Sequence, residues 1–203
     1  MNATFPRSER LTIFSDGVFA IIMTILVLDL RPPHGADWRS LISLWPSAVS
    51  YAVSYVFLAI VWLNHHHLLR FAPAATPRLI WGNFAHLFSV SLVPFTTAWI
   101  ADSRLGAVPV ALYALVFFLV NTTYMVLCME VVDSPDIEVV TVRMRRTMRI
   151  RCFTTMGVFF AAALVALVYP IGGLALICLC LILYLRPEAG TPEAGMQHPT
   201  TPQ

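Results

Sequence analysis

The chain has 203 residues, of which 58% are hydrophobic and only 12% charged, and its mean hydropathy is +0.75. A water-soluble domain carries about 25% charged residues, so this composition excludes a soluble globule and predicts an all-α integral membrane protein. The net charge is only +2 and the 13 basic residues, all arginines, lie in short clusters, so no nucleic-acid partner is expected.

Six apolar runs predict six transmembrane helices in one domain that covers residues 1–187. The runs span about residues 11–30, 42–69, 79–100, 107–129, 152–169 and 171–185. Each break between them contains proline, glycine or clustered charge, which ends a helix near the headgroup region. The proline-rich tail, 188–203, cannot bury enough apolar surface to fold, and it is predicted to be a disordered cytoplasmic tail.

The arginines predict how these helices are oriented in the membrane. If the N-terminus lies inside, ten arginines fall on the cytoplasmic side and only Arg31, Arg39 and Arg104 fall outside. Because positively charged short loops stay in the cytoplasm, this asymmetry favours cytoplasmic N- and C-termini. The arginine cluster from 143 to 151 is expected to contact anionic lipid headgroups.

The first apolar run carries two distinct faces. Ile21, Ile25 and Leu28 lie at positions i, i+4 and i+7, so on a helix they form one aliphatic stripe. Thr24 lies beside this stripe, whereas Asp16 lies about 140° away from it. Lipid contact and ordinary helix packing produce the same spacing, so the stripe alone does not identify a function.

Asp16 lies near the start of a span and needs a partner, because a charge costs about 2.5–3.5 kcal/mol at the centre of a membrane helix and less near its end. Two segments at the same predicted depth contain polar side chains. The second helix ends with Trp62, Asn64 and the three consecutive histidines 65–67, and the third begins with Trp81 and Asn83. Such a polar group is compatible with a structural anchor of the first helix and with a proton or cation site.

The side chains of three consecutive histidines do not predict a metal site. Consecutive residues on a helix point 100° apart, so His65, His66 and His67 cannot converge on one ion by themselves. The sequence also lacks a nucleophile with its base, paired catalytic carboxylates and a phosphate-binding loop, so no enzymatic activity is predicted.

Three polar motifs and the first apolar run together resemble a known family. Arg10-x-x-x-Phe14-Ser15-Asp16, followed by GVFAIIMTILVLDL, is similar to the signature of the transmembrane protein 175 (TMEM175) family of lysosomal and prokaryotic potassium channels. Further matching segments are Trp62-x-Asn64-His65-His66, Trp81-x-Asn83 and Pro94-Phe95, and the resemblance covers about residues 7–187.

The resemblance implies a prokaryotic single-repeat potassium channel that assembles as a homotetramer in the plasma membrane, with K⁺ as the permeant ion and no cofactor. It places Ile21, Ile25 and Leu28 on the pore axis as the constriction, with Thr24 beside them. It also implies a network that braces the first helix, formed by Arg10, Phe14, Ser15, Asp16, Trp62, Asn64, His65, His66, Trp81 and Asn83.

The residues explain how such a channel can work. No TVGYG-like segment is present, so a filter of backbone carbonyls is not available, and a ring of Ile and Leu side chains would instead gate by dewetting. The alternative is a proton-coupled transporter or proton channel that uses Asp16 and His65–His67. Transporters usually contain interrupted helices, for which Pro94 in the third helix is a weak signal.

Overall fold

The computed structural model describes residues 7–33, 35–72, 74–132 and 142–185. Within these ranges the chain is all-helical, as predicted. The helices are α1 (Arg7–Leu28), α2 (Trp38–Ile42), α3 (Trp45–Arg70), α4 (Pro77–Ser91), α5 (Val93–Asp102), α6 (Ala107–Val132), α7 (Val142–Val168) and α8 (Pro170–Leu185). The predicted tail, 188–203, lies outside the described residues.

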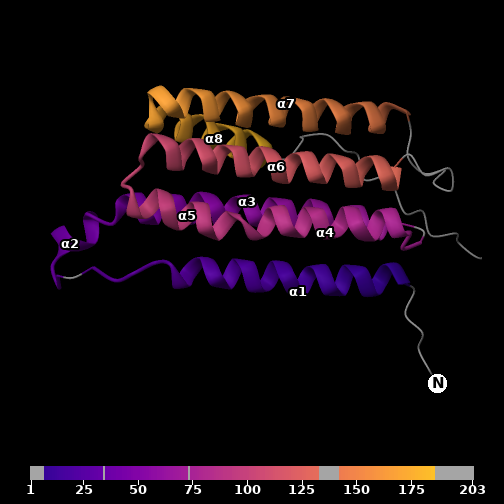
Figure 1. Cartoon of the computed structure of the whole chain (residues 1–203), viewed down its shortest axis with the longest axis horizontal. Coiled ribbons are helices and arrows are strands. Elements are labelled where there is room, and N and C mark those ends of the chain that lie inside the picture. Colours follow the sequence, from indigo (N-terminus) through magenta and orange to yellow (C-terminus); the bar gives the residue numbers. More distant parts are fainter. Residues whose placement is uncertain (1–6, 34, 73, 133–141, 186–203) are drawn as a thin grey trace, which may run out of the picture.

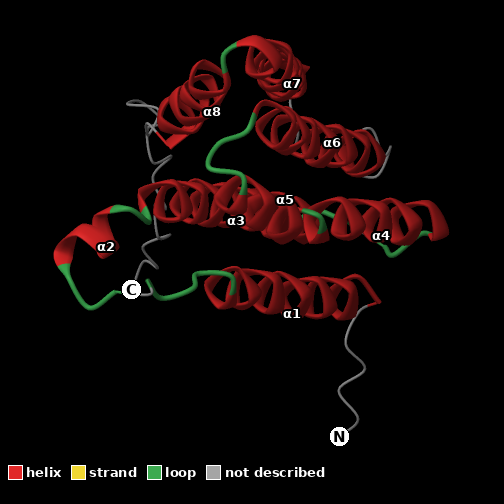
Figure 2. Cartoon of the chain, turned by 60° about the vertical axis from the view of Figure 1, so that its left-hand side comes forward, coloured by secondary structure: helices red, strands yellow, loops and turns green. Residues whose placement is uncertain are grey.

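The long helices run side by side in layers (Figures 1 and 2). α1 lies along one side of the bundle and packs on α3, α4 and α5. α6 lies on the other side of that middle layer, and it carries α7 and α8, with its most extensive contacts to α7. α1 is therefore a peripheral helix of the bundle, with one side against the other helices and one side uncovered.

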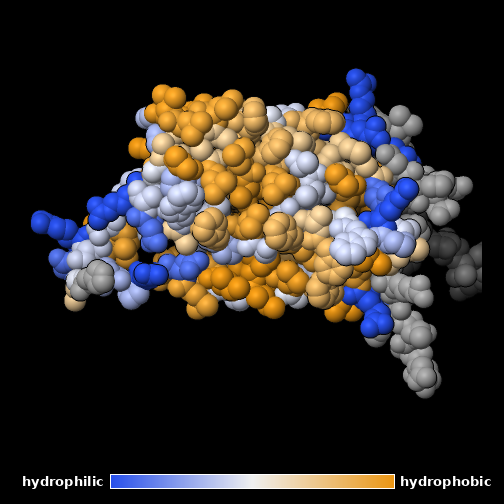
Figure 3. Space-filling view, viewed as in Figure 1, coloured by the Kyte–Doolittle hydropathy of each residue, from blue (hydrophilic) through white to orange (hydrophobic). Residues whose placement is uncertain are grey.

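Five segments of the described chain are long and apolar enough to cross a membrane. They are Glu9–Leu28, Trp45–Arg70, Pro77–Asp102, Ala107–Val132 and Arg145–Val168. The sixth predicted run forms α8, whose 16 residues extend only about 24 Å at 1.5 Å per residue, less than the thickness of a hydrocarbon core. Apolar side chains cover the middle of the visible face, and hydrophilic ones gather at its two ends (Figure 3).

The third apolar run differs from the single helix predicted over 79–100. α4 ends at Ser91 and α5 begins at Val93, with Pro94 in its first turn. Because proline has no backbone N–H and its ring collides with the preceding turn, the helical hydrogen-bond ladder breaks at Leu92. The two helices continue end to end and together make one 26-residue span.

The predicted loop between the first two spans contains the short helix α2. The Asp37 carboxylate accepts a hydrogen bond from the backbone N–H of Ser40, 2.9 Å away, and so caps the first turn. The side chain and backbone of Ser40 hydrogen-bond this carboxylate and lower its pKa from its ordinary value. The following helix begins at Trp45, rather than near residue 42, with Pro46 in its first turn.

The centre of the bundle is held by aromatic and small side chains. The rings of Phe57 and Phe117 stack with their centroids 3.5 Å apart, and Phe159 packs edge-on against both. α7 and α8 form a tight hairpin in which a Cβ atom at Gly173 would lie 2.6 Å from Ala166. Small residues at this crossing let the two helix backbones approach closely.

Candidate functional site

The buried face of α1 fixes how this helix sits on the subunit. Its fully or nearly buried side chains recur at intervals of three and four residues: Leu11, Ser15, Phe19, Ile22 and Leu26. This period of about one helical turn places them on one side of the helix, toward α3, α4 and α5. The side chains on the other side of α1 therefore face away from the rest of the bundle.

The predicted aliphatic stripe lies on the uncovered side of α1. The side chains of Ile21, Ile25 and Leu28 are 60%, 40% and 77% exposed in the single subunit. Thr24 is exposed beside them, and its hydroxyl donates a hydrogen bond to the carbonyl oxygen of Ile21 at 2.8 Å. The stripe is thus available to membrane lipid or to other copies of the chain.

A buried polar group ties α1 to α3 and α4. The side chains of Ser15, His65 and Asn83 are completely buried. Asn83 Nδ2 donates to Ser15 Oγ at 3.0 Å, and His65 Nε2 lies 2.7 Å from Asn83 Oδ1. Because an amide oxygen only accepts hydrogen bonds, His65 carries its proton on Nε2 in this arrangement. Burial of these bonds makes the position of α1 costly to change.

Asp16 makes a second contact between α1 and α3, which is more exposed than the buried group. Trp62 Nε1 donates a hydrogen bond to Asp16 Oδ1 at 2.9 Å, and His66 Nδ1 lies 3.3 Å from Oδ2. The side chains of Asp16 and His66 each remain about one third exposed. These two contacts supply the partners that the charge of Asp16 requires. They lie on the side of α1 between its buried face and the exposed stripe.

The other residues of the expected network do not join these two groups in the subunit. Trp81 is 74% exposed and packs its ring beside Phe84, which also contacts Phe14. Arg10 is exposed and lines a shallow hollow with Phe14 and Phe84; within the described residues no ion pair between Arg10 and Asp16 is found.

Asn64 points away from Asp16 altogether. Its Nδ2 atom donates to the hydroxyl of Tyr184 on α8 at 2.8 Å. On a helix the side chains of Asn64 and His65 point about 100° apart, so the two neighbours contact different helices, α8 and α4. The expected network is therefore divided into the buried group, the Asp16 group, an aromatic cluster and the separate Asn64 contact.

His86 extends the buried polar group, although the sequence did not suggest this role. Its ring stacks on His65 with the centroids 5.3 Å apart, and its Nδ1 atom lies 3.0 Å from Thr123 Oγ1 on α6. The available signal was its position three residues after Asn83, which places both on one face of a helix. In the part of the chain that the structure describes, no three His, Cys, Asp or Glu side chains are grouped closely enough to hold a metal ion.

These motifs lie mainly in a part of the chain that is similar to known proteins. The family model "Endosomal/lysosomal potassium channel TMEM175" matches residues 10–94. A protein named as a potassium channel from Chryseobacterium sp. (strain P1-3) is 40% identical over 118 residues, which is 58% of this chain and 62% of that protein. Residues 10–94 of this chain are thus similar to the TMEM175 family.

A solved structure shares the fold of this chain. The crystal structure of a lysosomal potassium-selective channel TMEM175 homolog from Chamaesiphon minutus superposes with a TM-score of 0.71, over 87% of this chain and 95% of that one, at 23% identity. The chicken protein named endosomal/lysosomal proton channel TMEM175 is 32% identical over 80 residues, or 34% of this chain and 16% of that protein. The match thus spans about three fifths of the bacterial relative and a much smaller part of the vertebrate one.

The TMEM175 family match covers the elements that carry both hydrogen-bonded groups. Residues 10–94 contain most of α1, all of α3 and α4, and the start of α5. The exposed stripe, the buried group around Asn83 and the Asp16 group all lie within it. The helices α6, α7 and α8 lie outside this match.

Proposed function

We propose that this chain is one subunit of a homotetrameric, potassium-permeable cation channel in which α1 of each subunit lines a central pore. The observation that carries the proposal is the uncovered stripe of Ile21, Ile25 and Leu28 on a helix whose other face is fully packed. One copy of α1 cannot enclose a water path, so several subunits must present the same stripe to a shared axis. The names of the bacterial relatives agree with this function.

The chemistry of the stripe suggests how ions are gated and selected. A ring of branched aliphatic side chains excludes water when it is narrow, and this dewetting stops ions. When wider, it makes an ion shed some of its hydration shell, which costs less for K⁺ than for Na⁺. Because the stripe carries no charge and no carbonyl ring, we expect moderate selectivity. Thr24, beside the stripe, supplies a hydroxyl next to the constriction.

The two hydrogen-bonded groups are proposed to hold α1 in the orientation that the pore needs. Rotation of this helix by one residue, about 100°, would turn the stripe away from the axis. Such a rotation would break the Ser15–Asn83 bond and the Trp62–Asp16 bond. We assign the exposed Arg10 and Trp81 and the Phe14–Phe84 contact to the cytoplasmic end of the same assembly.

The membrane placement follows the arginine distribution. We propose six spans, with both termini in the cytoplasm, in a prokaryotic plasma membrane, so that Arg31 and Arg104 lie outside and the arginines of α7 lie inside. In this arrangement the Asp16 group lies near the inner end of the pore. The partners are other copies of the chain, potassium ions and membrane lipids, with no cofactor.

Potassium flux into liposomes tests the proposal. Ile21→Ala removes bulk from the constriction, and we expect at least a several-fold higher K⁺ flux than for the parent chain. Val27→Ala is the matched control, because Val27 is an exposed branched residue of α1 that lies about 120° from the stripe. Unchanged flux in Ile21→Ala, or an equal increase in Val27→Ala, would contradict the assignment.

A proton pathway is the second candidate, and two observations favour it. The chicken and zebrafish relatives are named proton channels, and the ionisable pair Asp16 and His66 is 3.3 Å apart at a partly exposed site. Imidazole exchanges protons near neutral pH, so such a pair can relay a proton.

Two gradients separate the candidates in the same liposomes. A cation channel gives an electrogenic flux driven by a K⁺ gradient at equal pH on both sides. A proton pathway gives acidification driven by a pH gradient without K⁺, and this flux should fall in His66→Gln. If K⁺ flux requires a pH gradient, the passive potassium channel is excluded in favour of a coupled transporter.

A further inference from the structure

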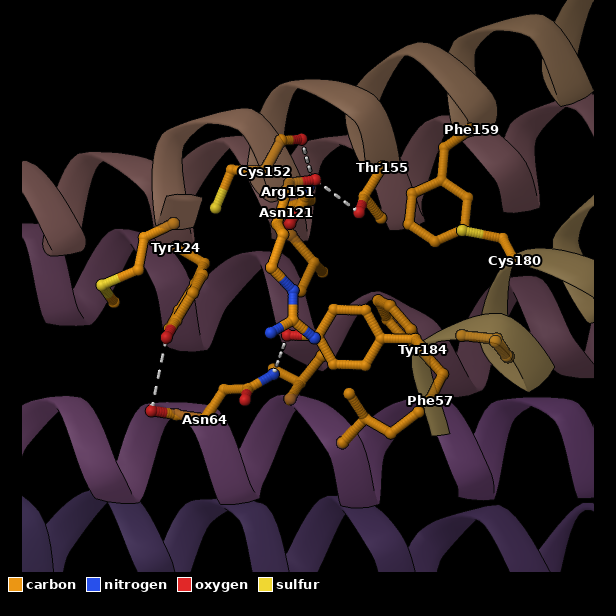
Figure 4. Close-up of a pocket in the computed structure, with 15 residues that line it drawn as sticks. Phe57, Asn64, Asn121, Tyr124, Arg151, Cys152, Thr155, Phe159, Cys180 and Tyr184 are labelled. Atoms are coloured by element: carbon orange, nitrogen blue, oxygen red, sulfur yellow. Dashed lines mark hydrogen bonds between the residues drawn. The ribbon is translucent and has the colours of Figure 1, made fainter. Parts of the chain in front are cut away.

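A cavity of about 160 Å³ lies between α3, α6, α7 and α8, on the side of the bundle away from α1 (Figure 4). It shares no lining residue with the stripe or with the two hydrogen-bonded groups of α1. For comparison, an apolar cavity of about 150 Å³ accommodates a benzene molecule. The space therefore holds a small group or a short segment of a longer chain, not a whole large ligand.

One region of the cavity wall is apolar. Phe57 and Val61 from α3, Phe159 from α7 and Leu181 from α8 line it, together with Ile60 and Val120. Most of these side chains belong to the buried core of the bundle, so the wall is fixed by packing. A hydrated ion gains nothing from this wall, whereas methylene groups of a lipid chain are stabilised there because they leave water.

The other region of the wall is polar and held in place by hydrogen bonds. Asn64 Nδ2 donates to the Tyr184 hydroxyl at 2.8 Å, and Asn121 Nδ2 donates to the carbonyl oxygen of Cys152 at 3.0 Å. Thr155 Oγ1 donates to the carbonyl oxygen of Arg151 at 2.8 Å. Side chains that are already ordered lose little conformational freedom when a ligand arrives.

Arg151 gives the cavity its charge. Its guanidinium carbon lies 5.0 Å from the centre of the Tyr184 ring, and Figure 4 shows the group extending from α7 toward Asn64 and Tyr184. Among the described residues that line the cavity none is acidic, and Arg151 brings a permanent positive charge to it. A guanidinium held in this way matches the geometry of phosphate oxygens.

The cavity lies where the chain changes from polar to apolar. Arg151 is the last charged residue of α7, which continues to Val168 with apolar and small side chains. Arg145, Arg146 and Arg149 precede it on the same helix. Such a transition marks the boundary between headgroups and hydrocarbon, so the charged region of the cavity lies at headgroup depth and the apolar region lies deeper in the membrane.

We propose that this cavity binds an anionic phospholipid, with the phosphate on Arg151 and the beginning of an acyl chain against Phe57 and Phe159. The charge favours an anionic over a zwitterionic headgroup, and the apolar wall favours a lipid over free phosphate. The bound lipid joins α7 and α8 to α3, the helix that carries the contacts of Asp16. Neither the site nor its test requires that the chain conducts ions.

Thermal unfolding of the purified full-length chain in detergent tests this site. The chain is measured alone, with phosphatidylglycerol, with phosphatidylcholine of the same acyl chains, and with inorganic phosphate. A ligand that binds only the folded state raises the unfolding midpoint, so we expect phosphatidylglycerol alone to raise it by several degrees. An equal rise with phosphatidylcholine, or with inorganic phosphate, would overturn the proposal in favour of bulk lipid or a free anion.

Variants test which residues produce the lipid-dependent rise of the unfolding midpoint. Each variant is compared with itself without lipid, so that any loss of basal stability cancels. Arg151→Gln removes the charge and should reduce the lipid-dependent shift at least several-fold. Cys180→Leu keeps Arg151 but fills some of the cavity, and it should reduce the shift too. Arg149→Gln, an exposed position outside the cavity, should retain it. A full shift in both cavity variants, or an equal loss in Arg149→Gln, would overturn the assignment.

Discussion

Asn83 is the residue that connects most of the buried polar contacts of α1. Its amide donates to Ser15 through nitrogen and accepts from His65 through oxygen, and all three side chains are completely buried. A buried polar group that loses its partner costs about 1–3 kcal/mol, because water cannot replace the bond. Asp16 is different, since it is partly exposed and water can satisfy it.

This difference predicts the relative effect of two substitutions. Asn83→Leu keeps the approximate size of the side chain but leaves His65 Nε2 without its acceptor, while Ser15 retains its hydrogen bond to the carbonyl oxygen of Leu11. We therefore expect a loss of about 1–3 kcal/mol in stability. Asp16→Asn keeps an oxygen that can accept from Trp62, so its loss should be smaller. Thermal unfolding of the purified chain in detergent measures both, and a larger effect of Asp16→Asn would contradict this ranking.

At the scale of helices, hydropathy predicted the five helices of the described residues that are long enough to cross a membrane, but not their local breaks or rotations. It also did not predict that α7 begins at Val142 rather than near residue 152. The runs are set by composition, which is why α6 begins at Ala107 as expected. The interruption at Leu92 depends on Pro94, whose effect within an apolar run ranges from a bend to a break. The rotation of α3, which sends Asn64 and His65 to different neighbours, depends on packing that sequence spacing does not show.

The α7–α8 hairpin provides a test at this scale. At Gly173 a Cβ atom would lie 2.6 Å from Ala166 Cβ and 2.8 Å from the backbone oxygen of Ala162, so Gly173→Ala must separate the helices. We expect a loss of about 1–3 kcal/mol, as for other overpacked sites. Gly157→Ala on α7 is the control, because no atom lies within 4 Å of its added Cβ. Equal unfolding midpoints for the two variants would argue against close packing at this crossing.

At the scale of the whole molecule, the subunit is a packed bundle with an unusual peripheral helix. α1 covers only one side of the α3–α5 layer, while α6, α7 and α8 cover the other. Sequence spacing predicted that Asp16 and the stripe lie on separate faces, and depth predicted two segments, residues 62–67 and 81–83, as candidate partners of Asp16. In the structure Trp62 and His66 of the first segment contact it. The sequence could not reveal the cavity around Arg151, because that cavity lies between four helices whose relative rotations are set only by tertiary packing.

We propose that the stripe on α1 faces a water-filled pore. The most direct measurement is the current through Ile21→Cys channels before and after a cationic methanethiosulfonate reagent, with the parent chain and Val27→Cys treated in the same way. The parent contains four cysteines of its own and supplies the baseline. We predict that the reagent reduces the current only in Ile21→Cys; a reduction in Val27→Cys with none in Ile21→Cys would show that another face of α1 lines the pore.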